Sequence, residues 1–425
     1  MEFLYPFLNY LQPGILWPQI APYKPMLIAS LIAGFATLRG SAKPNPALTK
    51  AYLTHPSVKW LLFYVVVQVI SVYYSGVLGM LEKLDFWDVF AIFTVISLYM
   101  IKDAKSLRRY VWGTILGSGY VIFYALHAVA VNAPWIQIQD GRAGAYGMYM
   151  NQNDYSFIII MVFPFAYLYL RTCRHFWQKL LLAAVMIGGI IGVMLSLSRG
   201  GVLALVLEAL LIVGTTMRGG RRALVLAIMA VLGTIASVHL FAAREADQAG
   251  VYTLKDSEDT RFQLWNAARV MWEAHPILGV GSMRFSEFAP KYAPISRDDR
   301  GKVAHNTYLE IAADTGTLGL GSFLLMLWGA WAGIRHARLQ DATGDGVIEA
   351  QVAAKVMMLG LLFRASFDAK EYDWSFYFLV VVAIATSTLS RFSTRSSVVS
   401  EVGPPIPTEV KPAVYGGLLG GRRHS

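Results

Sequence analysis

An arginine and two glycines at the junction of two long apolar segments give the first candidate for chemistry. In SLSRGGVLAL, Arg199 lies between the apolar segments 180–198 and 201–217, so its guanidinium is confined to the point where one ends and the next begins. Gly200 and Gly201 allow a tight turn and leave backbone N–H groups open at the start of the second segment. A helix N-terminus beside an arginine is a favourable site for a phosphate group. The alternative is an interfacial arginine that extends toward lipid headgroups.

A second arginine candidate lies in the polar segment that follows. Residues 257–274 have the pattern of an amphipathic helix, and Arg261 falls in its first turn, where a cation is unfavourable for the helix dipole. Arg269 lies eight residues further on, close to the same face, and a solvated helix surface is the favoured interpretation for it. Arg261 is therefore the stronger candidate for binding an anion.

A histidine marks the point where the polar segment returns to an apolar one, in AHNTYLEIAADTG. His305 is of a residue type that changes charge near neutral pH and acts as a general base in many enzymes. Asn306 beside it can bind a sugar or orient the imidazole ring. Glu310 and Asp314 follow at a spacing of four, on one face of a helix, where an unpaired acid is costly inside a membrane.

Two charged residues in a later apolar segment, Lys355 and Arg364, are the expected partners of these acids. The four side chains then link two helices, and a proton path is the less favoured interpretation.

Two short polar clusters complete the set of candidates. The first, residues 142–154, contributes Arg142, and the second, residues 368–373, contributes the carboxylates Asp368, Glu371 and Asp373. Carboxylates are the ligands that divalent cations prefer. A charged short loop is nevertheless the favoured interpretation, so we expect no metal and no other cofactor.

The elements that must position these residues are long and apolar. Of the 425 residues, 56% are hydrophobic and 15% are charged, whereas about 25% of a soluble domain is charged. These values exclude an ordinary soluble enzyme and a disordered chain. The apolar runs are continuous, unlike those of an outer-membrane barrel, and the single cysteine, Cys173, excludes an intrachain disulfide and a multi-cysteine metal site. The net charge of +10 fits a topology signal better than nucleic-acid binding.

Twelve apolar segments approach the roughly 20 residues that a membrane helix needs. They are residues 4–20, 25–38, 60–81, 86–101, 110–131, 154–170, 180–198, 201–217, 223–243, 306–334, 349–367 and 374–390. The first two are the weakest, because prolines interrupt one and the other is short. We therefore expect an all-α polytopic integral membrane protein with about twelve transmembrane helices.

The distribution of Lys and Arg predicts the orientation of these helices. Of the 37 such residues, 21 lie in the C-terminal tail and in alternate short loops, whereas five lie in the short loops of the other side. Positive charge gathers on the cytoplasmic side, so both termini are predicted to be cytoplasmic. The predicted domains are helices one to nine in 1–243, an external loop with the amphipathic helix in 244–305, helices ten to twelve in 306–392 and a disordered cytoplasmic tail in 393–425.

Four short motifs resemble the O-antigen ligase and polymerase family of bacterial envelope glycosyltransferases. They are Ser198-Arg199-Gly200, Arg261-x-x-x-Trp265, His275-Pro276-Ile277-Leu278-Gly279-Val280-Gly281 and His305-Asn306-Thr307-Tyr308-Leu309. The resemblance is strongest over residues 140–320. The order and spacing of the motifs are specific for the family and not for one of its members.

This resemblance implies a GT-C-like enzyme of the bacterial inner membrane with a periplasmic active site. It implies a glycan on undecaprenyl diphosphate as donor, and lipid A–core, a growing chain or a protein as acceptor, with membrane lipids around them and no nucleic acid. It assigns diphosphate binding to Arg199 and Arg261 and catalysis to His305. The further candidates for substrate binding are Arg142, which matches an upstream Arg-x-x-Gly pattern more loosely, and Gly200, Asn306 and Asp373.

The residue types agree with this chemistry on physical grounds. Two arginines can stabilise a diphosphate leaving group without a metal, and a neutral imidazole can take the proton of an attacking hydroxyl. Such a single displacement inverts the anomeric carbon. We expect a ligase first, an O-antigen polymerase second and a protein O-oligosaccharyltransferase third. A lipid-linked sugar transporter, the alternative of another class, is disfavoured because the polar groups cluster at the outer boundary and no internal repeat is visible.

Overall fold

The computed structural model describes residues 1–39, 45–75, 81–134, 136, 142–217, 219–226, 228, 254–341, 344–369 and 373–401. Over these ranges every regular element is a helix. The α-helices are α1 (Leu4–Leu11), α2 (Pro13–Leu16), α3 (Pro25–Arg39), α4 (Pro46–Leu53), α5 (Pro56–Tyr74), α6 (Leu81–Met100), α7 (Ala104–Ala130), α9 (Gln152–Thr172), α10 (Phe176–Leu195), α11 (Arg199–Thr216), α13 (Leu254–Ala274), α14 (Phe285–Tyr292), α15 (Thr307–Ile334), α16 (Val347–Ala365) and α17 (Trp374–Glu401). The 3-10 helices are η1 (Pro18–Tyr23), η3 (Gly147–Tyr149), η4 (Arg297–Asp299) and η5 (Leu339–Asp341).

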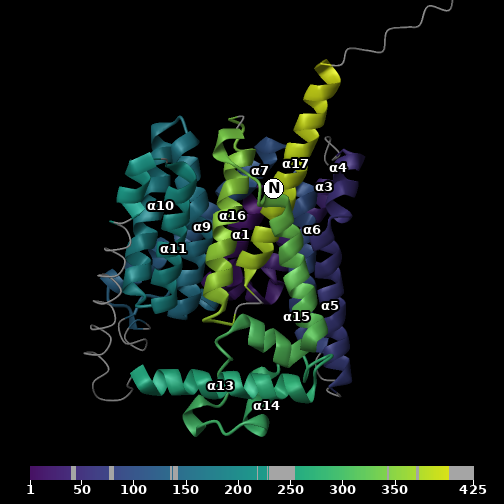
Figure 1. The fold of residues 1–425 in the computed structure, drawn as a ribbon, viewed down its shortest axis with the longest axis vertical. Coiled ribbons are helices and arrows are strands. Elements are labelled where there is room, and N and C mark those ends of the chain that lie inside the picture. The colour runs from purple at the N-terminus through teal and green to yellow at the C-terminus, as the bar shows by residue number, and fades with distance from the viewer. Residues whose placement is uncertain are drawn as a thin grey trace, which may run out of the picture.

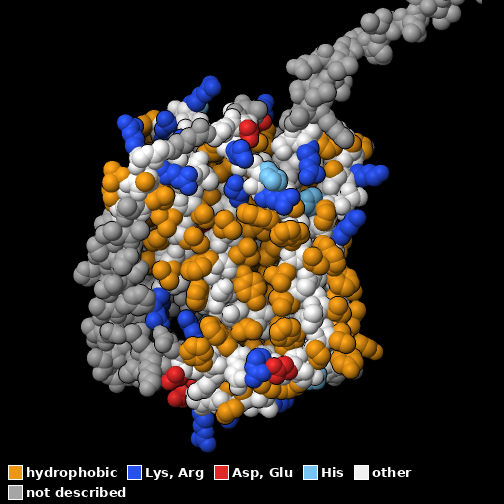
Figure 2. All heavy atoms as spheres, in the orientation of Figure 1, with side chains coloured by type: hydrophobic (Ala, Val, Ile, Leu, Met, Phe, Trp, Pro, Cys, Tyr) orange, Lys and Arg blue, Asp and Glu red, His pale blue; other side chains and the backbone are white. Residues whose placement is uncertain are grey.

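Seven of the described helices are long and apolar enough to cross a membrane. They are α5, α7, α9, α10, α11, α15 and the part of α17 up to Phe392, and two shorter apolar stretches lie in α3 and α6. Figure 2 shows hydrophobic side chains around the middle of the molecule and Lys and Arg side chains gathered mainly at the end from which α17 projects. The chain is therefore an all-α polytopic membrane protein, as its composition predicts.

The first predicted span, residues 4–20, is not one continuous helix. It consists of α1, α2 and the start of η1, each too short to cross a bilayer, and a new helix begins at Pro13 and again at Pro18. Gln12, between α1 and α2, has a φ of +48°, a backbone conformation that ends a helix. Proline lacks the N–H that continues a helix, so the sequence itself breaks this span. Most of the predicted span 223–243 lies outside the described residues.

The last helix extends further than predicted. α17 continues to Glu401, into the segment from residue 393 that the composition predicts to be disordered. No proline or glycine interrupts residues 393–401, and the first prolines of the tail, Pro404 and Pro405, follow the end of this helix. Residues 402–425 lie outside the described part of the chain.

The centre of the bundle is formed by helices that are distant in sequence. α15 packs against α5, and α16 packs against both α9 and α17. α9 and α17 are the most enclosed of the candidate membrane helices, each with 78% of its apolar window buried. Figure 1 shows α13 lying across the lower end of the bundle, with α14 beneath it. The polar candidates therefore face a central group of helices capped at one end by α13.

The predicted amphipathic helix is present as α13. Leu264, Ala267, Ala268 and Met271 form its buried face, at the spacing of one side of a helix, and they share a small core with α14 and the start of α15. Arg269 lies on the opposite, exposed face and pairs with Glu273. This agrees with the favoured prediction that Arg269 belongs to a solvated helix surface. The helix is thus held by protein contacts along one side.

The glycine-rich motif 275–281 lies against a break in α15. Gly316 has a φ of +67° inside that helix, and the carbonyls freed there accept hydrogen bonds from Val280 and Gly281. A Cβ on Gly279 would lie 2.3 Å from the backbone of Asp314, so only glycine allows these two segments of the backbone to approach so closely. The motif therefore attaches the loop to the membrane helix that begins just after His305.

Candidate functional site

His305 is held in an uncommon backbone conformation just before α15. Its φ is +52°, which a non-glycine residue adopts only where its surroundings impose it. Both backbone hydrogen-bonding groups of the preceding residue, Ala304, are used. Its N–H donates to Glu310 at 2.6 Å, and its carbonyl accepts from Trp265 of α13 at 2.9 Å. Trp265 of the Arg261-x-x-x-Trp265 motif therefore helps to position the histidine.

Asn306 forms the N-cap of α15. Its Oδ1 accepts from the N–H groups of Tyr308 and Leu309, each at 3.1 Å, and its Nδ2 donates to the Ser366 carbonyl at 3.3 Å. Asn306 therefore fixes the start of α15 against the end of α16. The sequence suggested that it binds a sugar or orients the ring, whereas these hydrogen bonds are to backbone groups.

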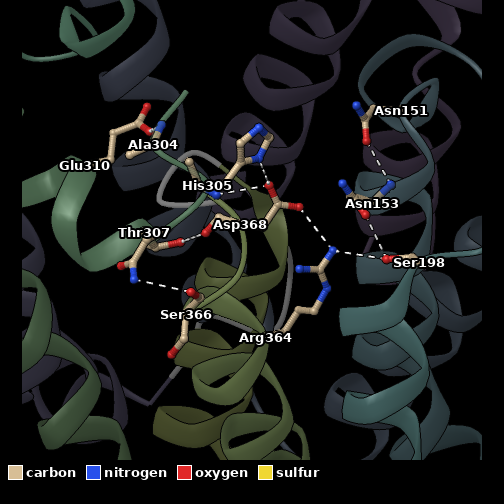
Figure 3. Close-up of polar contacts among 12 residues, drawn as sticks. Asn151, Asn153, Ser198, Ala304, His305, Thr307, Glu310, Arg364, Ser366 and Asp368 are labelled. Atoms are coloured by element: carbon tan, nitrogen blue, oxygen red, sulfur yellow. Dashed lines mark hydrogen bonds and ion pairs between the residues drawn. The ribbon is translucent and has the colours of Figure 1, made fainter. Parts of the chain in front are cut away.

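Asp368 connects His305 to a buried arginine (Figure 3). One of its carboxylate oxygens lies 3.6 Å from His305 Nδ1, and the other accepts from Arg364 at 3.2 Å. The Asp368 carbonyl also accepts from the Thr307 hydroxyl at 2.7 Å. The side chains of Arg364 and Asp368 are 1% and 4% exposed, so this is a buried ion pair, and the His305 side chain is 26% exposed. The imidazole is thus the member of the three that reaches the surface.

The same arginine reaches the turn between α10 and α11. Arg364 donates to Ser198 Oγ at 3.5 Å, and Ser198 in turn donates to Asn153 Oδ1 at 2.8 Å and caps the start of α11. Leu197, next to Ser198, has a φ of +49°. Figure 3 shows Arg364 between Asp368 on one side and Ser198 with Asn153 on the other. The turn that carries Arg199 is therefore joined to the histidine through two buried side chains.

Gly200 has a role that its neighbours in sequence do not reveal. A Cβ at this position would lie 3.1 Å from Nη1 of Arg364, so the missing side chain leaves the space that the guanidinium occupies. Arg199, the first residue of α11, is half-buried beside it. The helix N-terminus and two arginines therefore meet at one turn, which is the environment that the sequence predicts for a phosphate group.

Arg142 lies against the other side of this turn. Its Nε donates to the Ser196 carbonyl at 3.0 Å, and the N–H of Ala143 donates to the Leu195 carbonyl at 3.0 Å. The structure therefore brings Arg142 to the same turn as Arg199, although the two are far apart in sequence.

Arg261 lies in the second turn of α13, because the helix begins at Leu254, and not in the first turn as predicted. The neighbouring Thr260 ties this turn to the loop. Thr260 donates to Asp299 at 3.0 Å, and Asp299 also accepts from Ser296 and Lys302. Burial acts to raise the pKa of Asp299, but the hydrogen bonds from Lys302, Ser296 and Thr260 outweigh it and hold that pKa below its usual value. Asp299 therefore fixes the turn of α13 from which Arg261 extends.

Asp373 has a structural contact. Its Oδ1 accepts from the Ser375 N–H at 2.8 Å, at the start of α17, and the residue is 6% exposed. This position is typical of a helix N-cap. Glu371 lies outside the described residues.

The expected pairing of Glu310 and Asp314 with Lys355 and Arg364 is wrong. Glu310 accepts from the Ala304 N–H and Asp314 from the Arg284 N–H, so both acids bind backbone groups of the loop. Lys355 donates to the carbonyls of Arg335 and Ala337 at the other end of α15. Backbone N–H groups in the turns around α15 are closer donors to these carboxylates than a cation on another helix.

The partner of Arg364 is Asp368, four residues further along the same chain. In a helix, a spacing of four residues places two side chains on the same face. This spacing is the one feature of the sequence that could have predicted the pair. Glu310 and Asp314 have the same spacing on another helix, so the sequence does not show which acid pairs with Arg364. Only the fold decides this.

Residues 183–324 match a family model whose description is O-antigen ligase. This part of the chain is similar to the O-antigen ligase family. The match supports an enzyme of O-antigen ligase or polymerase type, and it confirms the resemblance carried by the four motifs. The family implies a lipid-linked glycan and a lipid acceptor in general terms.

The O-antigen ligase match covers part of the site only. It includes Arg199, Arg261 and His305 and ends before α16, so it contains neither Arg364 nor Asp368. No curated protein matches the chain. The contacts of Arg364 and Asp368 are therefore known from the geometry of this molecule.

Proposed function

We propose that this protein is an O-antigen ligase that moves a glycan from undecaprenyl diphosphate to lipid A–core at the periplasmic face of the inner membrane. The reaction is inverting and needs no metal or other cofactor. The observation that carries the proposal is the series of contacts from His305 through Asp368 and Arg364 to Ser198. It places a candidate base next to the turn that carries a candidate diphosphate ligand, Arg199.

His305 is proposed to be the base that activates the acceptor hydroxyl. Its Nδ1 is buried and faces the Asp368 carboxylate at 3.6 Å, which is longer than a hydrogen bond and within the range of an ion pair. Nε2 is then the ring nitrogen for the hydroxyl. The carboxylate attracts the positive charge that the ring gains when it takes the proton, and this favours proton transfer.

The leaving group requires charge stabilisation more than a proton. As the acceptor oxygen bonds to the anomeric carbon, the bond from that carbon to the diphosphate oxygen breaks, and the hydroxyl proton passes to Nε2 of His305. The negative charge that develops on the diphosphate is stabilised by Arg199, by the N-terminus of α11 and by Arg261. Arg142, which contacts the same turn, is a further phosphate ligand in this proposal.

The orientation in the membrane is part of the same proposal. Lys and Arg are concentrated in the tail and in the loops on its side, and Figure 2 shows them mainly at the end from which α17 projects. α13 lies at the opposite end (Figure 1), and Trp265 of this helix donates to the Ala304 carbonyl directly before His305. The charge rule therefore favours a periplasmic site with both termini in the cytoplasm.

The test is glycan transfer by the purified full-length protein in detergent, with lipid-linked donor and lipid A–core. We expect product without any vesicle and without added metal, and activity that survives excess chelator. A transporter would give no product under these conditions. Inactivation by chelator with recovery on Mg²⁺ would overturn the metal-independent mechanism.

Matched arginine variants test the diphosphate role. Arg199→Ala and Arg261→Ala should each lose transfer strongly, and Lys should restore only part of it, because a lysine does not bind phosphate in a bidentate manner. Arg269→Ala is the control, since that residue lies on the exposed face of the same helix as Arg261. Near wild-type transfer by a normally expressed Arg199→Ala protein would remove Arg199 from the mechanism.

A polymerase or a protein O-oligosaccharyltransferase of the same family would use the same groups with a different acceptor. Deletion of the gene separates these possibilities. Polymer that accumulates on the lipid carrier and is lost from lipid A–core supports the ligase. Loss of chain lengthening would identify a polymerase.

A further inference from the structure

Phe262 presents an aromatic ring on the exposed face of α13. It is 63% exposed, whereas Leu264, on the face that packs against α14 and α15, is 1% exposed. The proposed mechanism uses Arg261 and positions Trp265 of the same helix, and it leaves Phe262 without a role. A single exposed apolar residue is common on protein surfaces, so the meaning of this one depends on its surroundings.

Polar side chains surround Phe262 on this face. Asp259, Gln263 and Asn266 are all exposed. Asp259 and Asn266 lie three residues before and four residues after Phe262, and residues at these spacings are neighbours on a helix surface. A helix that lies in a bilayer presents a wide apolar face to the lipid. This face instead combines one ring with carboxylate and amide groups, so it suits contact with water and a polar ligand.

The ring of Phe262 is positioned by Trp265. The two ring centroids are 5.6 Å apart and the planes meet at 79°, which is a favourable edge-to-face arrangement. Trp265 is itself fixed, because its Nε1 donates to the Ala304 carbonyl at 2.9 Å. Phe262 therefore packs on a side chain that is anchored directly before His305. A ring that is held in place before binding loses little freedom when a ligand contacts it.

Phe262 also adjoins the proposed diphosphate ligand, because Arg261 is the residue before it. In the proposed reaction the first sugar of the donor carries the diphosphate on its anomeric carbon and receives the acceptor hydroxyl at the same carbon. This sugar therefore lies between Arg261 and His305. The rest of the glycan continues from it into the aqueous phase, at the end of the bundle across which α13 lies (Figure 1). The exposed face around Phe262 is thus next to the path of the glycan.

The chemistry of this face matches a sugar ring. A pyranose has a face of C–H groups and a rim of hydroxyls. The C–H groups carry a slight positive charge, which the negative face of an aromatic ring attracts. The hydroxyls donate and accept hydrogen bonds, and the Asp259 carboxylate accepts while the Gln263 amide does both. A phosphate would be repelled by Asp259, and a lipid chain would leave both polar groups without a hydrogen bond to the ligand.

We propose that the exposed face of α13 binds the glycan of the donor, with Phe262 stacked against the C–H face of a sugar ring and with Asp259 and Gln263 bonded to its hydroxyls. This inference rests on the proposed transfer of a lipid-linked glycan and not on the identity of the acceptor. It makes Phe262 a residue that distinguishes the glycan-bearing carrier from the bare carrier. After transfer the bare undecaprenyl diphosphate lacks this contact, which favours its release.

The test compares the binding of two lipids to the full-length protein in detergent. One is undecaprenyl diphosphate, and the other is the undecaprenyl-diphosphate-linked glycan isolated from cells in which the gene is deleted. Phe262→Ala should weaken binding of the glycan-linked lipid roughly three- to tenfold, as expected for the loss of one aromatic contact, and should leave the bare carrier unchanged. Phe176→Ala is the matched control, because Phe176 at the start of α10 is 68% exposed and should affect neither lipid.

Two further variants separate stacking from a general apolar contact. Phe262→Tyr keeps a ring and should bind the glycan-linked lipid as the wild type does, whereas Phe262→Leu keeps an apolar side chain and should bind it as weakly as Phe262→Ala.

Binding of the bare carrier shows that each variant is folded. Unchanged binding of the glycan-linked lipid by Phe262→Ala, equal weakening of both lipids, or full binding by Phe262→Leu would overturn this inference alone. A wild-type protein that binds neither lipid would overturn the proposed donor together with it.

Discussion

In the first turns of α15, Glu310 and Asp314 accept hydrogen bonds from backbone N–H groups. Asp368, in the turn after α16, accepts from the Ala369 N–H but also faces the side chains of His305 and Arg364. All three carboxylates are buried at the same end of the bundle. A backbone donor is neutral and is satisfied by any acceptor oxygen. A guanidinium or an imidazolium requires a negative charge. The identity of the donor therefore separates carboxylates that maintain the fold from the one that acts in the proposed reaction.

The largest effect in this comparison is expected at His305 itself. His305→Ala should lower the turnover number by about 10²–10⁴-fold, the usual contribution of a general base, while the donor still binds. His305→Gln keeps a hydrogen-bonding group and cannot take a proton at neutral pH, so it should be nearly as slow. Transfer rates and donor binding of the purified variants measure this, with His336→Ala at an exposed position as control. If the Gln variant keeps most of its activity, His305 orients the substrate and is not the base.

The next effect distinguishes Asp368 from the acids of α15. Asp368→Asn keeps the shape and one acceptor oxygen but removes the charge that faces His305 Nδ1. We expect the turnover number to fall by about 10–100-fold, a loss similar to that of the outer partner of a catalytic or metal-bound histidine, with the KM for the donor unchanged. A change in KM alone would assign Asp368 to substrate binding.

The ion pair of Asp368 with Arg364 allows folding and catalysis to be separated. Arg364→Met leaves a buried carboxylate without its cation and should cost about 3–5 kcal/mol of stability. The double variant Arg364→Met with Asp368→Leu removes both charges and should regain most of that stability. It should remain slow, because His305 has no carboxylate. Thermal melting and transfer rates of the two proteins measure this, and recovery of activity in the double variant would contradict the positioning role of Asp368.

How far the sequence predicts this site depends on the range of the interaction. Arg199, Arg261 and His305 are predicted from the sequence because each belongs to a short motif at or near the boundary of an apolar segment. The break of the first span was foreshadowed by Pro13 and Pro18, since proline acts locally. The partner of His305 was not predictable in this way. Asp368 follows it by more than 60 residues, and which acid reaches the ring depends on how α15 and α16 pack.

The same limit applies to Gly200. A tight turn is an evident local reason for a glycine at this position, but the guanidinium of Arg364 that occupies the space above it comes from another helix. Long-range packing therefore decides what this glycine allows.

A small effect is expected at Glu310. Glu310→Gln keeps an acceptor oxygen for the Ala304 N–H, so transfer should stay close to the wild-type rate. Glu310→Ala removes the acceptor and should cost about 1–3 kcal/mol of stability, the penalty of a buried N–H without a partner. The two variants, compared with Asp368→Asn in the same assay, test whether charge matters at one position and not at the other. A strong loss of turnover in Glu310→Gln would show that both acids act through their charge.

The smallest effect is expected at Asp299, which is held by side-chain donors as Asp368 is, but lies in the loop beside Arg261. Asp299→Asn should lower stability by about 1 kcal/mol, since the Lys302 side chain is 40% exposed and two hydroxyl bonds remain possible. The turnover number should not change, and the KM for the donor should rise because the turn of α13 around Thr260 is held less firmly. The pKa of Asp299 is lowered by its hydrogen bonds in the folded protein, so its stabilisation is complete above the ordinary aspartate pKa of about 3.9 and is lost as the pH falls through the lowered value. Hydrogen exchange of the amides around Thr260 should therefore be faster in the variant than in the wild type at pH 5–7, and the difference should shrink only below about pH 4. A difference that already disappears between pH 7 and pH 5 would mean that another group, and not Asp299, fixes this end of α13.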